Sequence, residues 1–114
     1  MEKLKVQRIA QHAVINVESE KLDSLLAPHV KANIIHLLSE GVQNIVLNLE
    51  SVRYCDSSGL GAILLGNRNC QSTGGKFIIC NLSEPVQHLI GVSKLENTIH
   101  IQNSVQDSLE KFFL

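Results

Sequence analysis

Tyr-Cys-Asp-Ser-Ser-Gly-Leu-Gly, residues 54–61, is the stretch with the most unusual chemistry in the chain. It follows an apolar run, Asn44–Leu49, that is typical of a buried strand, and it precedes Ala62–Leu65, typical of the early turns of a helix. A strand that passes directly into a helix places one carboxylate and two hydroxyls at a helix N-terminus. There the backbone N–H groups are unpaired and negative charge is favoured. The stretch therefore predicts a strand–turn–helix unit capped by Asp56 or Ser57.

Two interpretations of this turn stay open from the residues alone. Serine and aspartate before a helix are by default ordinary caps. Capping needs one side chain, whereas this turn offers three, together with Gly59 and Gly61, which helix propensity disfavours. Without side chains, the two glycines allow another protein or a nucleotide to approach the backbone. A cap alone and a functional turn are equally supported, and the functional hypothesis is that one serine is phosphorylated.

The rest of the chain alternates strand and helix patterns. Residues 5–9 and 13–17 predict an N-terminal β-hairpin, and further strands are predicted at 44–49, 76–82 and 99–101. Between and after them lie four helical patterns, of which the second reaches about residue 72. Strands and helices in alternation imply a largely parallel sheet with crossover helices. The sequence thus predicts one α/β domain over residues 1–114, with a mixed, mostly parallel sheet of four to five strands.

Cap residues mark the ends of these helices. Asp23 supplies a capping oxygen before the first helix, whose first turn contains Pro28. Ser83 is expected to cap the third helix, which Gly91 is expected to stop. Ser104 opens the last helix, and its apolar side chains are expected to face inward: Val105, Leu109, Phe112 and Phe113.

Composition excludes several classes of protein. The 114 residues, 44% of them hydrophobic, suffice for one buried core. A net charge of −1 without a basic stripe opposes direct nucleic-acid binding. No apolar run is long enough to insert into a membrane, and Met1–Lys5 lacks the apolar segment of a signal peptide. Three widely spaced cysteines predict reduced, mostly buried thiols and a cytoplasmic location.

The residues from Ile45 to Gly61 resemble the signature of STAS domains, most closely that of bacterial anti-sigma-factor antagonists. Comparable features occur along nearly the whole chain, at Leu22-Asp23 before a helix that starts with proline, at 74–76 before an apolar strand, and at 83–86. The resemblance implies a STAS-like, non-catalytic regulator that needs no cofactor of its own. It also implies that a partner, which is both an anti-sigma factor and a serine kinase, phosphorylates the first serine after the aspartate. The resemblance further implies that a PP2C-type phosphatase reverses this step. Carried over by position, the acceptor is Ser57.

The resemblance also implies which residues meet the kinase. The unphosphorylated protein is expected to capture the kinase and so free its sigma factor. Asp23 is favoured as a helix-entry cap, and the family's acidic residue at this place makes it an interface candidate as well. The other partner-binding candidates are Asp56, Ser57, Ser58, Gly59, Leu60 and Gly61.

Other functions are considered beside this one. A STAS module could instead serve as a scaffold, or as a lipid-transport or signalling subunit in which Ser57 is never phosphorylated. A small hydrolase could use Ser57 or Cys55, but the Gly-x-Ser-x-Gly pattern is absent around both. Glu84 and His88 lie four residues apart, which is more typical of a solvated helix face than of a metal site. Neither 59–61 nor 74–76 completes a nucleotide-binding motif.

Overall fold

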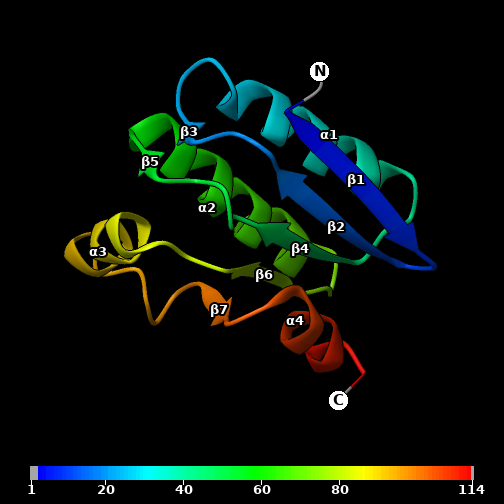
Figure 1. Cartoon of the computed structure of the whole chain (residues 1–114). Helices are drawn as coiled ribbons and strands as arrows, with labels where there is room; N and C mark the ends of the chain where they lie inside the picture. Colours follow the sequence, from blue (N-terminus) through cyan, green and yellow to red (C-terminus); the bar gives the residue numbers. More distant parts are fainter. Residues whose placement is uncertain (1–2, 114) are drawn as a thin grey trace.

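The computed structural model describes residues 3–113 and is built on a five-stranded mixed sheet (Figure 1). The strands are β1 (Leu4–Ile9), β2 (His12–Val17), β4 (Asn44–Asn48), β6 (Phe77–Cys80) and β7 (His100–Gln102), in the order β1-β2-β4-β6-β7. The first two form an antiparallel hairpin, and every later neighbour is parallel. This arrangement confirms the predicted hairpin and the mostly parallel sheet.

Four helices complete the described part of the chain: α1 (Ala27–Ser39), α2 (Ser57–Ser72), α3 (Glu84–Val92) and α4 (Val105–Lys111). The first three supply buried side chains to one large core, which also contains Ile45, Leu47 and Phe77 from the sheet. Helix α4 covers the opposite face, where Leu109 packs with Val46 in a smaller cluster. Alternate residues of the three central strands, β2, β4 and β6, therefore enter different cores, as the pleat requires.

A second, very small sheet was not predicted. β3 (Lys21–Leu22) pairs in parallel with β5 (Tyr54–Cys55), in the register Lys21↔Tyr54 and Leu22↔Cys55. Strands of two residues are too short to show a hydrophobic period, so the sequence pattern does not predict them. This sheet fixes the segment before α1 beside the segment before α2, and both helices begin at the same end of the molecule (Figure 1).

Three expectations about the last two helices are wrong. The Ser83 hydroxyl donates to the Val52 carbonyl at 2.8 Å instead of capping α3, and α3 continues past Gly91 to Val92. Phe113 is 73% exposed, because α4 ends at Lys111 and Phe113 lies beyond its apolar stripe. The cap at Ser104 is confirmed, since its hydroxyl oxygen accepts from the Asp107 N–H at 3.0 Å.

Candidate functional site

The turn at residues 56–58 begins α2, and Asp56 is its cap. The Asp56 backbone is extended, with φ −105° and ψ −169°, so the helix starts at Ser57. One carboxylate oxygen, Oδ1, accepts from the N–H of Ser58 at 2.9 Å and from the N–H of Gly59 at 3.1 Å. Two of the otherwise unpaired N–H groups of the helix end are thereby satisfied. Of the two predicted capping residues, Asp56 performs the capping.

The two serines differ in access. Ser57 is exposed in the first position of α2, whereas Ser58 is half-buried. Because Asp56 supplies the cap, the Ser57 hydroxyl is not used in this role. Its exposure leaves Ser57 open to an enzyme from outside, and an anion attached to it would lie at the positive end of the α2 dipole.

The two glycines of the turn are in different surroundings. Gly59 is buried, and an added Cβ would clash with the Leu22 carbonyl oxygen and lie 2.7 Å from Cys55 Sγ. Its missing side chain therefore lets α2 pack against β3. Gly61 is half-buried and open, since an added Cβ would meet only Lys31 Nζ, at 3.8 Å. Leu60, between them, is half-buried and packs against the main core.

Asp23 lies at the same end of the molecule as Asp56. The parallel pairing of β3 with β5 ends with Leu22 opposite Cys55, so the two aspartates follow paired strands. Asp23 Oδ1 accepts from the N–H groups of Leu25 at 3.1 Å and Leu26 at 3.3 Å. It therefore stabilises the turn that leads into α1 and does not cap the helix itself, because the N-cap residue of α1 is Leu26, which makes no side-chain cap hydrogen bond. The predicted site residues are Asp23 and residues 56–61, and the structure places all of them at the same end of the molecule.

The thiols do not favour nucleophilic chemistry. Burial, with the neighbouring Asp56 charge as a smaller cause, raises the pKa of Cys55 to about 11. Burial also raises the pKa of Cys70 to about 12, and raises that of Cys80 to about 11. A thiol is nucleophilic as its thiolate, so these groups are unreactive near neutral pH. Within residues 3–113, no three histidine, cysteine or acidic side chains are grouped to hold a metal ion.

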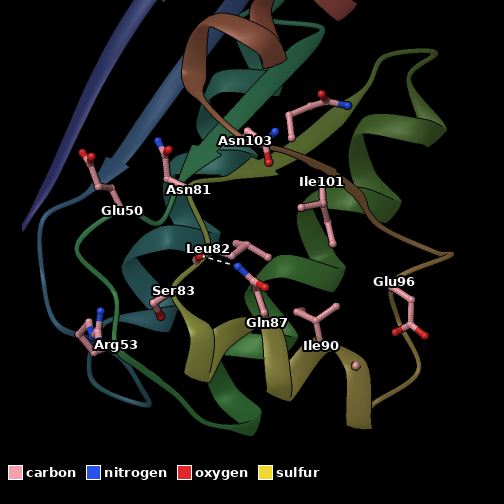
Figure 2. A pocket seen from close by; sticks show the side chains of 12 residues that line it. Glu50, Arg53, Asn81, Leu82, Ser83, Gln87, Ile90, Glu96, Ile101 and Asn103 are labelled. Atoms are coloured by element: carbon pink, nitrogen blue, oxygen red, sulfur yellow. Dashed lines mark hydrogen bonds between the residues drawn. The ribbon is translucent and has the colours of Figure 1, made fainter.

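A pocket of about 650 Å³ lies apart from this turn, beyond the carboxyl ends of β4, β6 and β7 (Figure 2). Figure 2 shows α3 along its lower side, where the Gln87 side chain donates to the Leu82 carbonyl at 3.0 Å. The lining is mixed, with apolar Leu82, Ile90 and Ile101 among amides and charged groups of both signs. No predicted site residue lines this pocket, and no motif in the sequence indicates it. Separately, none of the helices in the described range is both long and apolar enough to cross a membrane.

Comparison with known proteins identifies the class. The model of the STAS domain family matches residues 3–108. The chain therefore belongs to the STAS domain family, which confirms the resemblance seen in residues 45–61. Among named relatives, an anti-sigma F factor antagonist of Paenibacillus polymyxa is 33% identical over 67 residues, or 59% of this chain and 57% of the relative. An anti-sigma-B factor antagonist of Staphylococcus epidermidis is 23% identical over 86 residues, covering 75% of this chain and 80% of the relative. The chain thus spans a little over half of the first relative.

Solved structures share the fold at low sequence identity. A Thermotoga maritima protein superposes with a TM-score of 0.85 at 22% identity, over 97% of this chain and 95% of that one. The unphosphorylated form of the anti-sigma factor antagonist SpoIIAA gives a TM-score of 0.81 at 22% identity, over 95% and 94% of the two chains. The phosphorylated form of the Bacillus cell fate determinant SpoIIAA gives 0.74 at 21% identity, over 95% and 97%. These likenesses establish the STAS fold.

Proposed function

We propose that this protein is an anti-sigma-factor antagonist that phosphorylation of Ser57 switches off. In this proposal the unphosphorylated protein binds a serine-kinase anti-sigma factor, which then releases its sigma factor. The observation that carries the proposal is the exposure of Ser57 in the first position of α2, beside an aspartate that caps the helix without it. The names of the relatives, and the existence of SpoIIAA in a phosphorylated form, support the same role.

The docking surface proposed is the end of the molecule where α1 and α2 begin. It comprises Asp23 and residues 56–61, and the whole chain is taken as one STAS domain. Two exposed apolar side chains lie close by in the sequence, Leu25 at 81% and Tyr54 at 53% exposure. Apolar and aromatic side chains of this kind are enriched in the centres of protein interfaces. They give the kinase an apolar surface to bury next to the acceptor serine.

The switch follows from the chemistry of the phosphate. Transfer from ATP forms a bond between Ser57 Oγ and the γ-phosphorus, and it releases ADP and the hydroxyl proton. The new group carries roughly −1.5 to −2 charges at neutral pH. On the free protein this charge remains in water. Between two docked proteins it would be desolvated beside Asp56, which costs on the order of 3–5 kcal/mol when the charge is unpaired, or roughly two to four decades in affinity. The modified protein therefore leaves its partner, and a PP2C-type phosphatase resets it.

Incubation with the cognate kinase and ATP tests the proposal. Intact-mass measurement should show one phosphate on the wild-type protein, on Ser58→Ala as the matched control, and none on Ser57→Ala. In a binding assay, Ser57→Asp should lose the kinase, while Ser57→Ala should bind it and stay bound after ATP is added. Wild-type affinity in Ser57→Asp would contradict the switch. No adduct at all would favour a scaffold or a lipid-transport or signalling subunit.

We propose no catalytic activity for the chain. The hydrolase alternative is opposed by the raised pKa of Cys55 and by the absence of a Gly-x-Ser-x-Gly turn at Ser57. Ester turnover that disappears in Ser57→Ala would overturn this view. The free cysteines support a reducing compartment, the cytoplasm, as its location.

A further inference from the structure

Lys31 lies on α1 where this helix passes the first turns of α2. Its side chain is half-buried, and its ammonium nitrogen, Nζ, lies 3.8 Å from the position that a Cβ on Gly61 would take. Within 4 Å of that position, outside the helix's own backbone and the chain neighbours of Gly61, the described residues contribute no other atom. A glycine at position 61 therefore leaves a space on the surface of α2, and the ammonium group of Lys31 occupies its edge.

Lys31 has no carboxylate partner among residues 3–113. A lysine beside a neighbouring helix can pack its aliphatic stem on apolar surface with its ammonium group in water, or it can form an ion pair across the two helices. The ion pairs of the described residues all lie elsewhere: Lys5 with Glu18, Arg8 with Glu40, and His36 with Glu40. Within the described residues, no carboxylate of the unmodified protein therefore accounts for the place of the Lys31 ammonium group beside α2.

Ser57 is on the same face of α2 as Gly61. The two residues are four apart, a separation that puts side chains one above the other, with about 5–6 Å between Cβ atoms. Helical Cα–Cβ bonds also point toward the helix N-terminus, so the space at Gly61 opens toward Ser57. The Lys31 ammonium group thus lies within about 10 Å of the Ser57 Cβ atom. Four flexible carbons and three donor hydrogens let a lysine close such a gap by changing rotamer.

We propose that Lys31 is the counter-ion of a phosphate on Ser57, reaching it across the space that Gly61 leaves open. This inference rests on the proposed phosphorylation of Ser57. Asp56 beside the acceptor and, across the small sheet, Asp23 carry charges that repel a phosphate, whereas the cations Lys21 and Arg53 belong to the same two chain segments. Lys31 supplies the opposite charge from α1 and stabilises the phosphorylated form of the free protein.

Phosphoserine inserted at position 57 by genetic-code expansion allows a test that needs no kinase. Phosphorus NMR reports the second pKa of the phosphate, ordinarily about 6. A nearby ammonium group favours the dianion and lowers this pKa. We expect the pKa to rise in Lys31→Met by about half a unit, the size typical of an exposed ion pair. In Lys31→Arg it should stay close to the wild-type value, because the charge is kept.

Two further variants complete the test. Gly61→Leu fills the space through which Lys31 reaches the phosphate, so the second pKa of the phosphate should rise as it does in Lys31→Met. Arg68→Met is the matched control, since Arg68 is an exposed cation on α2 itself, roughly 16 Å farther along the helix axis and beyond the screening length at physiological salt. In Arg68→Met the second pKa of the phosphate should not change.

An unchanged phosphate pKa in Lys31→Met would overturn the proposal that Lys31 is the counter-ion, whether or not a kinase modifies Ser57. A rise of equal size in Arg68→Met would do the same, because the effect would then come from net charge alone. The kinase experiment on the unmodified protein decides the proposed function separately.

Discussion

Asp56 and Ser57 are neighbours in the chain, yet the structure separates what their side chains do. Asp56 turns back onto the helix end and accepts two backbone hydrogen bonds, while Ser57 stays exposed. The sequence predicted a capped helix N-terminus here, because capping depends on residues only two or three apart. It left the choice of cap open, since either side chain can serve. The extended backbone at Asp56 decides between them.

Replacing Asp56 by alanine should destabilise the fold by about 1 kcal/mol, the usual cost of losing an N-cap. Asp56→Asn keeps an acceptor oxygen and should lose only a few tenths of a kcal/mol. Ser57→Ala is the control, because an exposed side chain that makes no cap is expected to change stability by no more than about 0.5 kcal/mol. Urea unfolding measures all three. Equal losses in Asp56→Ala and Ser57→Ala would show that the serine, too, stabilises the helix end.

At the scale of elements, α2 shows what the sequence could not reveal. The glycines at 59, 61 and 66 look alike as residues that weaken a helix. Gly59 faces the backbone of β3, and Gly66 faces the Phe77 ring in the core, with Phe77 Cδ1 2.9 Å from the position of an added Cβ. These neighbours come from distant parts of the chain, so no local sequence pattern predicts the two contacts. The β3–β5 pairing likewise joins distant segments, so the sequence does not predict it.

The helix contains a matched pair of glycines for a stability test. Gly66→Ala should destabilise the protein by about 1–3 kcal/mol, because the methyl group overpacks the buried Phe77 ring. Gly61→Ala meets only Lys31 Nζ at ordinary contact distance, so it should be neutral or stabilise by up to about 1 kcal/mol through helix propensity. Thermal or urea unfolding distinguishes them. Destabilisation of the same size at both positions would mean that α2 does not pack on Phe77 as described.

For the whole molecule, the sheet divides the interior into two unequal cores. The larger core was predictable, because its apolar residues repeat with clear strand and helix periods over long segments. The smaller core under α4 was predicted in part. Leu109 and Phe112 pack toward Val46, as expected, but Phe113 remains outside because a seven-residue helix turns only one narrow stripe inward. Near a chain end, the exact end of a helix decides which side a residue faces, and sequence patterns locate helix ends poorly.

Both cores contain a buried thiol, and this makes the stability of the whole fold sensitive to alkaline pH. Cys70 lies in the larger core and Cys80 in the smaller, and burial raises the pKa of Cys70 to about 12 and of Cys80 to about 11, from an ordinary value of 9.0. Between these values the unfolded chain loses thiol protons that the folded chain keeps. Unfolding then releases protons, so the free energy of unfolding should be constant below about pH 8 and fall as the pH rises above 9, by at most about 1.4 kcal/mol per pH unit for each thiol.

Urea unfolding in the presence of a reductant, from pH 7 to pH 10.5, measures this slope. Cys70→Ala should be less stable than the wild type at pH 7, because it leaves a small cavity. Its stability should nevertheless fall less steeply above pH 9, since one of the raised thiols is gone. The slope of the unfolding free energy against pH separates the effect of thiol ionisation from the effect of packing. A cavity lowers the unfolding free energy at every pH by the same amount and leaves the slope unchanged. A slope as steep in Cys70→Ala as in the wild type would mean that this thiol ionises with the same pKa in the folded and unfolded chains.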